Sequence, residues 1–404
     1  MVERNANLAK LQAGYLFPEV SKRKEAFLKS NPGAKLINLG IGDTTEPLTP
    51  FVSEQLQRDS KDLGTREGYK GYGPCEGHMP LRERIAEKFY HGKVSADEIF
   101  ISDGAKCDMG RLQLLFSPRA SIAIQDPAYP VYVDTSVMMG RSGHYNAKEL
   151  QYHNIVYMPC SPENGFFPDL NKLPRTDIIY FCSPNNPTGA VATKAQLTEL
   201  VKLAIKNKSI ILFDAAYASY IQDPALPRSI YEIEGASKVA IEVNSFSKLA
   251  GFTGLRLGWS VVPKELRFDD GTPIYNDWQR IACTFFNGPS ILAQLGGLAV
   301  LDDKNKEALG AQLAHYMGNA QILREGLRQL GVVVYGGDNA PFLWAHFAGR
   351  DSWEVFEDLL KRANIVTTPG AGFGAAGQGF IRLTAFGTRS NIQEAVTRLK
   401  NALK

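Results

Sequence analysis

Five short apolar runs in the middle of the chain constrain its fold more than any other feature. They are residues 121–125, 178–182, 210–214, 239–243 and 257–262. A helical pattern of apolar residues over 194–206 separates two of these runs. Short apolar runs with helices between them are typical of a mostly parallel sheet that helices cover on both faces. We therefore predict an α/β fold.

Polar residues directly follow four of these runs. The segments are Asp126-Pro-Ala-Tyr129, Ser183-Pro-Asn-Asn186-Pro-Thr-Gly, Asp214-Ala-Ala-Tyr217 and Ser245-Phe-Ser-Lys248. In open parallel sheets, ligands bind at the carboxyl ends of the strands. The four segments are therefore expected to lie along one edge of the sheet and to form one binding site.

Lys248 is the most informative residue of these segments because its surroundings are apolar. Its neighbours are Phe246, Leu249, Ala250 and Phe252. A lysine taken alone is usually exposed as a solvated charge. Loss of water lowers the pKa of a lysine amine and makes it a nucleophile, which condenses with aldehydes to form a Schiff base.

The groups that flank Lys248 suit a phosphate. Ser245 and Ser247 supply hydroxyl groups before the lysine, and Arg256 supplies a guanidinium group after it. These are groups that bind a phosphate dianion. An aldehyde that carries a phosphate is pyridoxal 5'-phosphate, so the combination indicates this cofactor.

Three glycine-containing turns supply further candidate contacts. Gly42 lies in a turn after a short strand-like stretch, where glycine lets the backbone approach a ligand or simply makes the turn. Tyr72 lies in an aromatic, glycine-rich loop and either presents its phenol to a phosphate or packs on the surface. Ala105 and Lys106 begin a predicted helix after Gly104, and the N-terminus of a helix attracts anions.

The C-terminal third of the chain has a different pattern. A long helical segment from about residue 302 to 330 precedes strand-like stretches at 332–335, 342–347 and 380–384. This order predicts a smaller α+β domain, completed by the N-terminal segment. We expect a large domain over 45–300 and a small domain over 1–44 and 301–404, with the substrate in the cleft between them.

Composition excludes several classes of function. A net charge of +3 is too small to indicate binding to nucleic acid or to an anionic membrane. The five cysteines are scattered without a Cys-x-x-Cys pair, and the six histidines show no metal-ligand spacing. With no signal-peptide pattern and no apolar run of membrane-spanning length, we expect a cytoplasmic protein, or one of the plastid stroma if a transit peptide has been removed.

Several motifs together resemble those of the class I/II pyridoxal-phosphate aminotransferases. They are Leu11-Gln-Ala-Gly-Tyr-Leu-Phe-Pro, Asn38-Leu-Gly-Ile-Gly-Asp-Thr-Thr-Glu-Pro, Ser102-Asp-Gly-Ala-Lys-Cys-Asp, Asn185-Asn-Pro-Thr-Gly, Ser245-Phe-Ser-Lys-Leu-Ala-Gly-Phe-Thr-Gly and Ile381-Arg-Leu-Thr-Ala-Phe-Gly. The resemblance covers essentially the whole chain. It implies the fold-type I transferase architecture, with a large domain around a mostly parallel sheet and a smaller α+β domain.

The resemblance also assigns roles around the cofactor ring. It implies that Lys248 forms the Schiff base and later moves the substrate proton, and that Asp214 faces the ring nitrogen and keeps it protonated. Tyr217 and Asn186 are expected to contact the ring hydroxyl, and Tyr129 to stack on the ring face. A strand-end aspartate such as Asp214 also commonly caps a turn, which is its alternative role.

Further roles concern the cofactor phosphate and the substrate. The residues implied for the phosphate are Ser245, Ser247, Arg256, Ala105, Lys106 and a second subunit's Tyr72. Arg382 is implied to bind the substrate carboxylate with two parallel hydrogen bonds, although a lone arginine in a strand is more often structural. The resemblance implies that Tyr15, Gly42, Tyr72, Lys106, Tyr129, Asn186 and Asn287 line the substrate, with Asn287 also near the cofactor. Some of these belong to a partner chain, which implies a homodimer with shared active sites.

The implied reaction transfers an amino group between LL-2,6-diaminopimelate and 2-oxoglutarate in lysine biosynthesis, with tetrahydrodipicolinate and glutamate on the other side. One loop departs from the pattern. Where such sequences carry a glutamate that contacts the distal ammonium of diaminopimelate, this chain has Cys75, followed by Glu76. Either Glu76 replaces that glutamate or the contact with the distal ammonium is missing. The alternative function is therefore that of an aminotransferase acting on aspartate, aromatic amino acids or lysine.

A dehydrogenase is the remaining alternative from the sequence. Residues 372–377 fit the Gly-x-Gly-x-x-Gly pattern of dinucleotide-binding proteins, and Glu394 follows at the distance of a ribose-binding acid. However, the motif requires a strand before it and a helix that opens within it, whereas the next residues predict a strand. A regulator that only senses pyridoxal phosphate lacks support, because no helix-turn-helix precedes the predicted fold.

Overall fold

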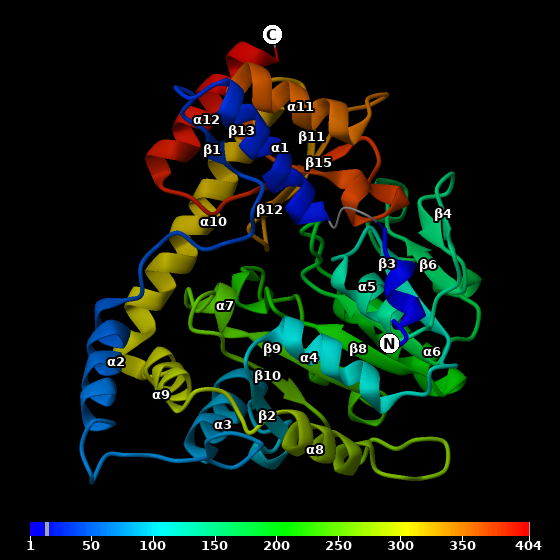
Figure 1. Cartoon of the computed structure of the whole chain (residues 1–404), viewed down its shortest axis with the longest axis vertical. Helices are drawn as coiled ribbons and strands as arrows, with labels where there is room; N and C mark the ends of the chain where they lie inside the picture. The colour runs from blue at the N-terminus through cyan, green and yellow to red at the C-terminus, as the bar shows by residue number, and fades with distance from the viewer. Residues whose placement is uncertain (13–15, 404) are drawn as a thin grey trace.

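The computed structural model describes residues 1–12 and 16–403, and its largest element is a seven-stranded sheet (Figure 1). The strand order is β2-β10-β9-β8-β7-β3-β6. Their bounds are β2 Ile99–Ser102, β3 Ile122–Asp126, β6 Ile155–Pro159, β7 Ile178–Cys182, β8 Ile210–Asp214, β9 Ala240–Ser245 and β10 Gly258–Val261. Only β10 runs antiparallel to its neighbours. The predicted α/β fold with a mostly parallel sheet is confirmed.

Helices bury both faces of this sheet, which explains the continuous apolar runs. On one face, Ile179, Phe181, Ile211 and Phe213 share a core with α3 (Met79–Ile85), α6 (Lys194–Asn207) and α9 (Ile291–Val300). On the other face, the alternate residues of the same strands pack with α4 (Ala105–Leu112), α5 (Val131–Met138) and α8 (Ile274–Phe285). Because successive side chains of a strand point to opposite faces, both positions must be apolar.

A second sheet lies above the first in Figure 1, with its own core. Its strands run in the order β11-β12-β15-β14, and their bounds are β11 Val333–Gly336, β12 Phe342–His346, β14 Thr368–Pro369 and β15 Phe380–Thr384. The helices that supply this core are α1 Leu16–Ser30, α10 Lys306–Arg328, α11 Ser352–Ala363 and α12 Arg389–Ala402. The N-terminal segment joins this core, since β1 (Ile37–Asn38) pairs with β13 (Ile365–Val366).

The remaining elements are short or peripheral. They are α2 Pro50–Asp62, α7 Phe246–Leu249, and the hairpin of β4 (Tyr145–Asn146) and β5 (Gln151–Tyr152). The domain boundaries predicted from the sequence, between residues 44 and 45 and between residues 300 and 301, stay a prediction.

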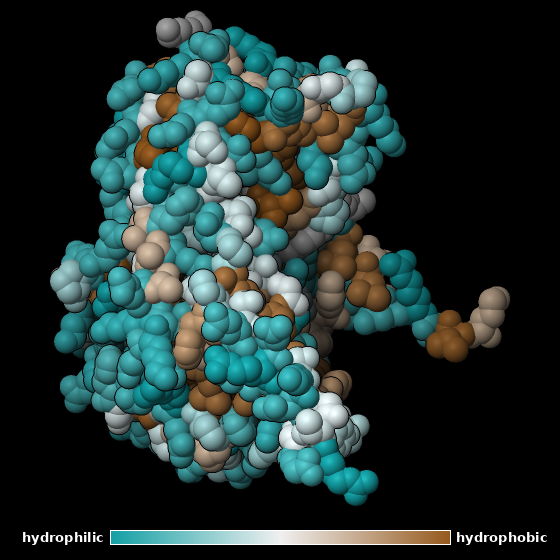
Figure 2. Space-filling view, turned by 90° about the vertical axis from the view of Figure 1, so that its left-hand side faces the viewer, coloured by the Kyte–Doolittle hydropathy of each residue, from teal (hydrophilic) through white to brown (hydrophobic). Residues whose placement is uncertain are grey.

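In the described ranges, no helix is long and apolar enough to cross a membrane. The face in Figure 2 is mostly hydrophilic, with apolar residues in small separate groups.

The glycine-rich stretch 372–377 does not have the strand-turn-helix arrangement of a dinucleotide site. It forms two short 3-10 turns between β14 and β15, and Glu394 lies within α12. A Cβ on Gly374 would lie 2.1 Å from the Asp126 carboxylate, and the N–H of Ala376 donates to that carboxylate at 3.1 Å. The glycine at position 374 therefore allows a close contact between the end of β3 and the segment before β15. Because the stretch lacks the structure of a dinucleotide site, the observation that favoured a dehydrogenase no longer supports it.

One glycine brings the start of α4 close to the sheet edge. A Cβ on Gly258 of β10 would lie 2.9 Å from the amide nitrogen of Ala105 and 2.8 Å from the carbonyl oxygen of Asn244. Contacts this short require backbone to move. The missing side chain thus sets the position of the helix N-terminus.

We expect Gly258→Ala to lower the apparent melting temperature, since inserting a methyl group into a closely packed position costs about 1–3 kcal/mol. The matched control is Gly110→Ala within α4, where nothing lies within 4 Å of the added carbon. Alanine is the better helix former by about 1 kcal/mol, so this control should be neutral or stabilising. Thermal unfolding followed by circular dichroism compares them, and equal losses in both would contradict the packing argument.

Candidate active site

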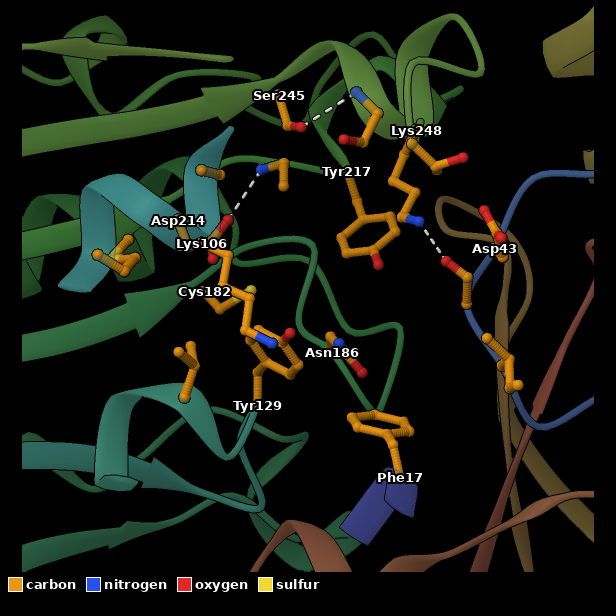
Figure 3. Close-up of a pocket in the computed structure, with 18 of the residues that line it drawn as sticks. Phe17, Asp43, Lys106, Tyr129, Cys182, Asn186, Asp214, Tyr217, Ser245 and Lys248 are labelled. Carbon is orange, nitrogen blue, oxygen red and sulfur yellow. Dashed lines mark hydrogen bonds between the residues drawn. The ribbon is translucent and has the colours of Figure 1, made fainter. Parts of the chain in front are cut away.

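A cavity of about 360 Å³ lies where the carboxyl ends of the parallel strands face the second sheet (Figure 3). Most of the residues predicted for the site line it. They are Gly42, Ala105, Lys106, Tyr129, Asn186, Asp214, Tyr217, Ser245, Ser247, Lys248, Arg256 and Arg382. The sequence reasoning about strand ends therefore located a real cavity.

Lys248 reaches into this cavity from α7, the short helix that follows β9. Ser245, the last residue of β9, caps this helix, because its Oγ accepts a hydrogen bond from the N–H of Ser247 at 3.0 Å. The amine of Lys248 donates to the carbonyl oxygen of Gly42, which Figure 3 shows as a dashed line beside Asp43. Burial lowers the pKa of Lys248 to about 8, and the nearby carboxylate of Asp43 opposes this shift. The lysine is thus a better nucleophile than an exposed one.

Asp214 lies at the end of β8, on another wall of the same cavity. Its Oδ2 accepts a hydrogen bond from the Tyr132 hydroxyl at 2.6 Å, and its Oδ1 accepts one from the N–H of Ala216 at 3.0 Å. Burial raises the pKa of Asp214, while these two donors oppose the rise. A positively charged group opposite this carboxylate would favour its ionised form.

The start of α4 and Arg256 form an end of the cavity that suits an anion. The first N–H groups of a helix have no partner within the helix, and Ala105 and Lys106 occupy these positions. Arg256 donates to the Ser247 hydroxyl at 3.3 Å and to the Thr253 carbonyl oxygen at 3.1 Å. Gly104 has a φ of 126°, a conformation that L side chains rarely adopt, and a Cβ there would also lie 2.4 Å from the Arg256 guanidinium, so the backbone favours glycine where the two elements meet.

Arg382 crosses into the cavity from β15 of the second sheet, and its side chain is 1% exposed. It donates to Asn186 Oδ1 at 2.7 Å and to the Gly40 carbonyl oxygen at 2.6 Å. Burial lowers the pKa of Arg382 to about 10. Among the described residues Arg382 forms no salt bridge, and its Nε has no hydrogen-bond partner. A buried cation without an acidic neighbour would be stabilised by a ligand carboxylate.

Aromatic rings shape the space between these charged groups. The guanidinium of Arg382 lies 4.8 Å from the ring centre of Phe342 and 4.9 Å from that of Phe373. Tyr217 packs edge-on against Phe342, with ring centres 4.7 Å apart. Tyr129 also lines the cavity, with the Lys106 amine 6.0 Å from the centre of its ring.

Four residues predicted for the site do not line the cavity in this chain or are not described. Tyr72 is 92% exposed and Asn287 is exposed, both away from the cavity. Glu76 accepts a hydrogen bond from Gln279 of α8. Tyr15 lies outside the described residues.

Sequence reasoning missed several residues that line the cavity. They are Phe17, Ile41, Asp43, Met109, Val131, Tyr132, Cys182, Ala216 and Thr253. Tyr132 had a detectable signal, because it follows Tyr129 at a spacing of three residues and Pro130 is a common helix start. Phe17 lies within the motif that begins at Leu11, but nothing in that motif indicates that its ring reaches a cavity formed mostly by residues far along the chain.

Comparisons with known proteins agree with this geometry. The profile of the family described as "Aminotransferase class I and II" matches residues 34–399. The chain is 56% identical over 403 residues to LL-diaminopimelate aminotransferase of Protochlamydia amoebophila, covering 100% of this chain and 98% of that protein. It is 53% identical over 404 residues to the chloroplastic LL-diaminopimelate aminotransferase of Arabidopsis thaliana, covering 100% of this chain and 87% of that protein.

Solved structures give the same answer. L,L-diaminopimelate aminotransferase from Chlamydomonas reinhardtii superposes with a TM-score of 0.96 at 55% identity, covering 100% of this chain and 99% of that chain. A mutant of Thermus thermophilus aspartate aminotransferase superposes with a TM-score of 0.83 at 24% identity over the full length of both chains, which shows a shared fold. The chain therefore belongs to the class I and II aminotransferase family.

Proposed function

We propose that the protein transfers an amino group between LL-2,6-diaminopimelate and 2-oxoglutarate, a step of lysine biosynthesis, with pyridoxal 5'-phosphate as its cofactor. Tetrahydrodipicolinate and glutamate form the other pair of reactants. The observation that carries the proposal is one cavity that holds a lysine of lowered pKa, a buried carboxylate and a buried arginine that has no acidic partner within residues 1–12 and 16–403. The names of the similar proteins point to the substrate.

The residues around the cavity fit this cofactor. The N–H groups at the start of α4, the hydroxyl groups of Ser245 and Ser247, and Arg256 would hold its phosphate. Lys248 would hold its aldehyde carbon, and Asp214 its ring nitrogen. When bound, pyridoxal phosphate supplies an electron sink for the carbanion that forms at the substrate Cα.

The protein's own residues would do the remaining work. Lys248, once free of the cofactor, would take the proton from the substrate Cα and pass it to C4′, the cofactor carbon that carries the aldehyde. Arg382 would bind the α-carboxylate, because the five N–H donors of guanidinium match the two oxygens of a carboxylate. Tyr129, Tyr217 and Asn186 would hold the ring between them, with Asn186 already hydrogen-bonded to Arg382.

We further propose that the active site is completed by a second copy of the chain. Tyr72 and Asn287 are exposed, and Tyr69 and Phe285 nearby in sequence are 71% and 65% exposed. Large exposed aromatic residues are typical of interfaces. In this arrangement Tyr72 and Asn287 would reach the cavity of the partner. We place the protein in the cytoplasm, or in the plastid stroma if a transit peptide has been removed.

The runner-up function, transfer from another amino acid, is favoured by one observation. The residue expected to carry a carboxylate for the distal ammonium is Cys75, and the neighbouring carboxylate of Glu76 already accepts a hydrogen bond from Gln279. Because Glu76 does not line the cavity of its own chain, we assign the distal contact to the Glu76 that a second copy of the chain would bring with the loop of Tyr72. A carboxylate has lone pairs for more than one donor, and Gln279 would orient it.

An amino-donor assay tests the proposed function most directly. LL-diaminopimelate should be a good donor to 2-oxoglutarate, with meso-diaminopimelate, lysine and aspartate much poorer. Lys248→Ala, purified in parallel, should lose the bound cofactor's linkage and all measurable turnover. Preferred use of aspartate or an aromatic amino acid would instead establish the runner-up function.

The lowered pKa of Lys248 predicts how cofactor attachment depends on pH. Only the unprotonated amine attacks an aldehyde, so the attachment rate of the cofactor-free protein should rise with pH, with its midpoint near pH 8, and then level off. An ordinary lysine, with a pKa of about 10.4, would give a rate that still rises at pH 9. Asp43→Asn removes a charge that raises the Lys248 pKa and should move the midpoint lower. The attachment is followed by the visible absorbance of the protein, and a midpoint at the ordinary value would contradict the argument.

A pair of variants tests the distal contact. Glu76→Gln should weaken kcat/KM for LL-diaminopimelate by about ten- to a hundredfold, the effect of one hydrogen bond to a charged group of about 1.5–3 kcal/mol. Glutamate has no distal ammonium, so kcat/KM for glutamate should change little. Cys75→Glu is the matched control and should be neutral or harmful. Equal losses for both substrates in Glu76→Gln, or a gain for diaminopimelate in Cys75→Glu, would remove Glu76 from this role.

A further inference from the structure

Tyr132 lines the cavity and contacts the carboxylate of Asp214. It is 2% exposed, and its hydroxyl donates to Asp214 Oδ2 at 2.6 Å, the length of a strong hydrogen bond to a charged acceptor. The only other hydrogen bond that the Asp214 carboxylate accepts among the described residues comes from the N–H of Ala216. Among the residues that the structure describes, Tyr132 is therefore the one side chain that donates a hydrogen bond to this carboxylate.

The packing of Tyr132 fixes the direction of its hydroxyl. Its ring stacks on Tyr180, with ring centres 5.4 Å apart and planes 22° apart, and it meets Tyr129 edge-on at 6.0 Å. Tyr180 and Cys182 share one face of β7, and Cys182 is paired in register with Asp214 of β8. A ring that lies over Tyr180 thus places its hydroxyl beside the end of the next strand.

In the hydrogen bond between Tyr132 and Asp214, the buried phenol is the donor and the carboxylate is the acceptor. Burial and the adjacent Asp214 raise the pKa of Tyr132 well above its ordinary value. Tyr132 therefore stays protonated and donates to Asp214. A donor of this kind stabilises the negative charge of the carboxylate and lowers its affinity for a proton.

Resting on the proposed function, we propose that Tyr132 is a positioning residue that keeps the proton shared by Asp214 and the cofactor on the ring nitrogen. Asp214 and a pyridine nitrogen compete for one proton. Without the Tyr132 hydroxyl, the carboxylate becomes the stronger base and takes more of that proton. The ring then loses positive charge, which is the property that lets it accept electrons from the substrate.

Three variants test this proposal. Tyr132→Phe removes one hydroxyl and keeps the stacked ring. Tyr180→Phe is the matched control, because Tyr180 lies in the same stack, has its own hydroxyl bonded to Gln113, and does not contact Asp214. Asp214→Asn removes the carboxylate charge and serves as the reference for an unprotonated ring nitrogen.

The readout is the nitrogen-15 resonance of ring-labelled pyridoxal phosphate bound to the intact protein. Wild type and Tyr180→Phe should give the resonance of a protonated ring, and Tyr132→Phe should move toward the unprotonated position that Asp214→Asn marks. In parallel, kcat for LL-diaminopimelate should fall about ten- to a hundredfold in Tyr132→Phe, with KM nearly unchanged, as for the loss of one hydrogen bond to a charged group.

The outcomes separate this inference from the proposed function. A protonated ring in both the wild type and Tyr132→Phe would overturn the role of Tyr132 and leave the proposed function standing. An equal displacement of the resonance in Tyr180→Phe would also overturn it, because the effect would then come from packing. A wild-type protein that binds no pyridoxal phosphate would overturn both.

Discussion

The parallel pairing of β7, β8 and β9 is the constraint on which the site depends. In this register Cys182 lies beside Asp214, and Asp214 lies beside Val243, so the three strands end at one edge. The segments that follow the strands, two loops and the helix α7, then carry Asn186, Tyr217 and Lys248 into the same cavity. Residues distant in sequence share one site because backbone hydrogen bonds align the strands that precede them.

The second sheet supplies one wall of the cavity and a positively charged side chain. Arg382 reaches it from β15, and the carbonyl oxygens of Gly40 and Gly42 reach it from the loop after β1. Two cationic side chains, Arg382 and Lys248, thus lie buried in one region, where the charge of Asp43 acts on Lys248. Burying two positive charges without anionic partners costs free energy. Anionic ligands such as a phosphate and a carboxylate would offset this cost.

Much of this could be predicted from the sequence, because the apolar runs and the motifs after them are local signals. The runs at 178–182 and 210–214 became β7 and β8 with the same bounds. The contact of Gln279 with Glu76 could not be predicted, since 203 residues separate them and only the packing of α8 brings them together. The roles proposed for Tyr72 and Asn287 would depend on a second copy of the chain, which no pattern within one chain describes.

The central claim is that Lys248 is the residue that attaches the cofactor, and reduction with borohydride tests it most directly. The purified protein is reduced, digested, and its peptides are identified by mass spectrometry. The account predicts that the added cofactor mass is found on the peptide that contains Lys248. Attachment to Lys106, the other lysine that lines the cavity, or the absence of any modified lysine would contradict the account.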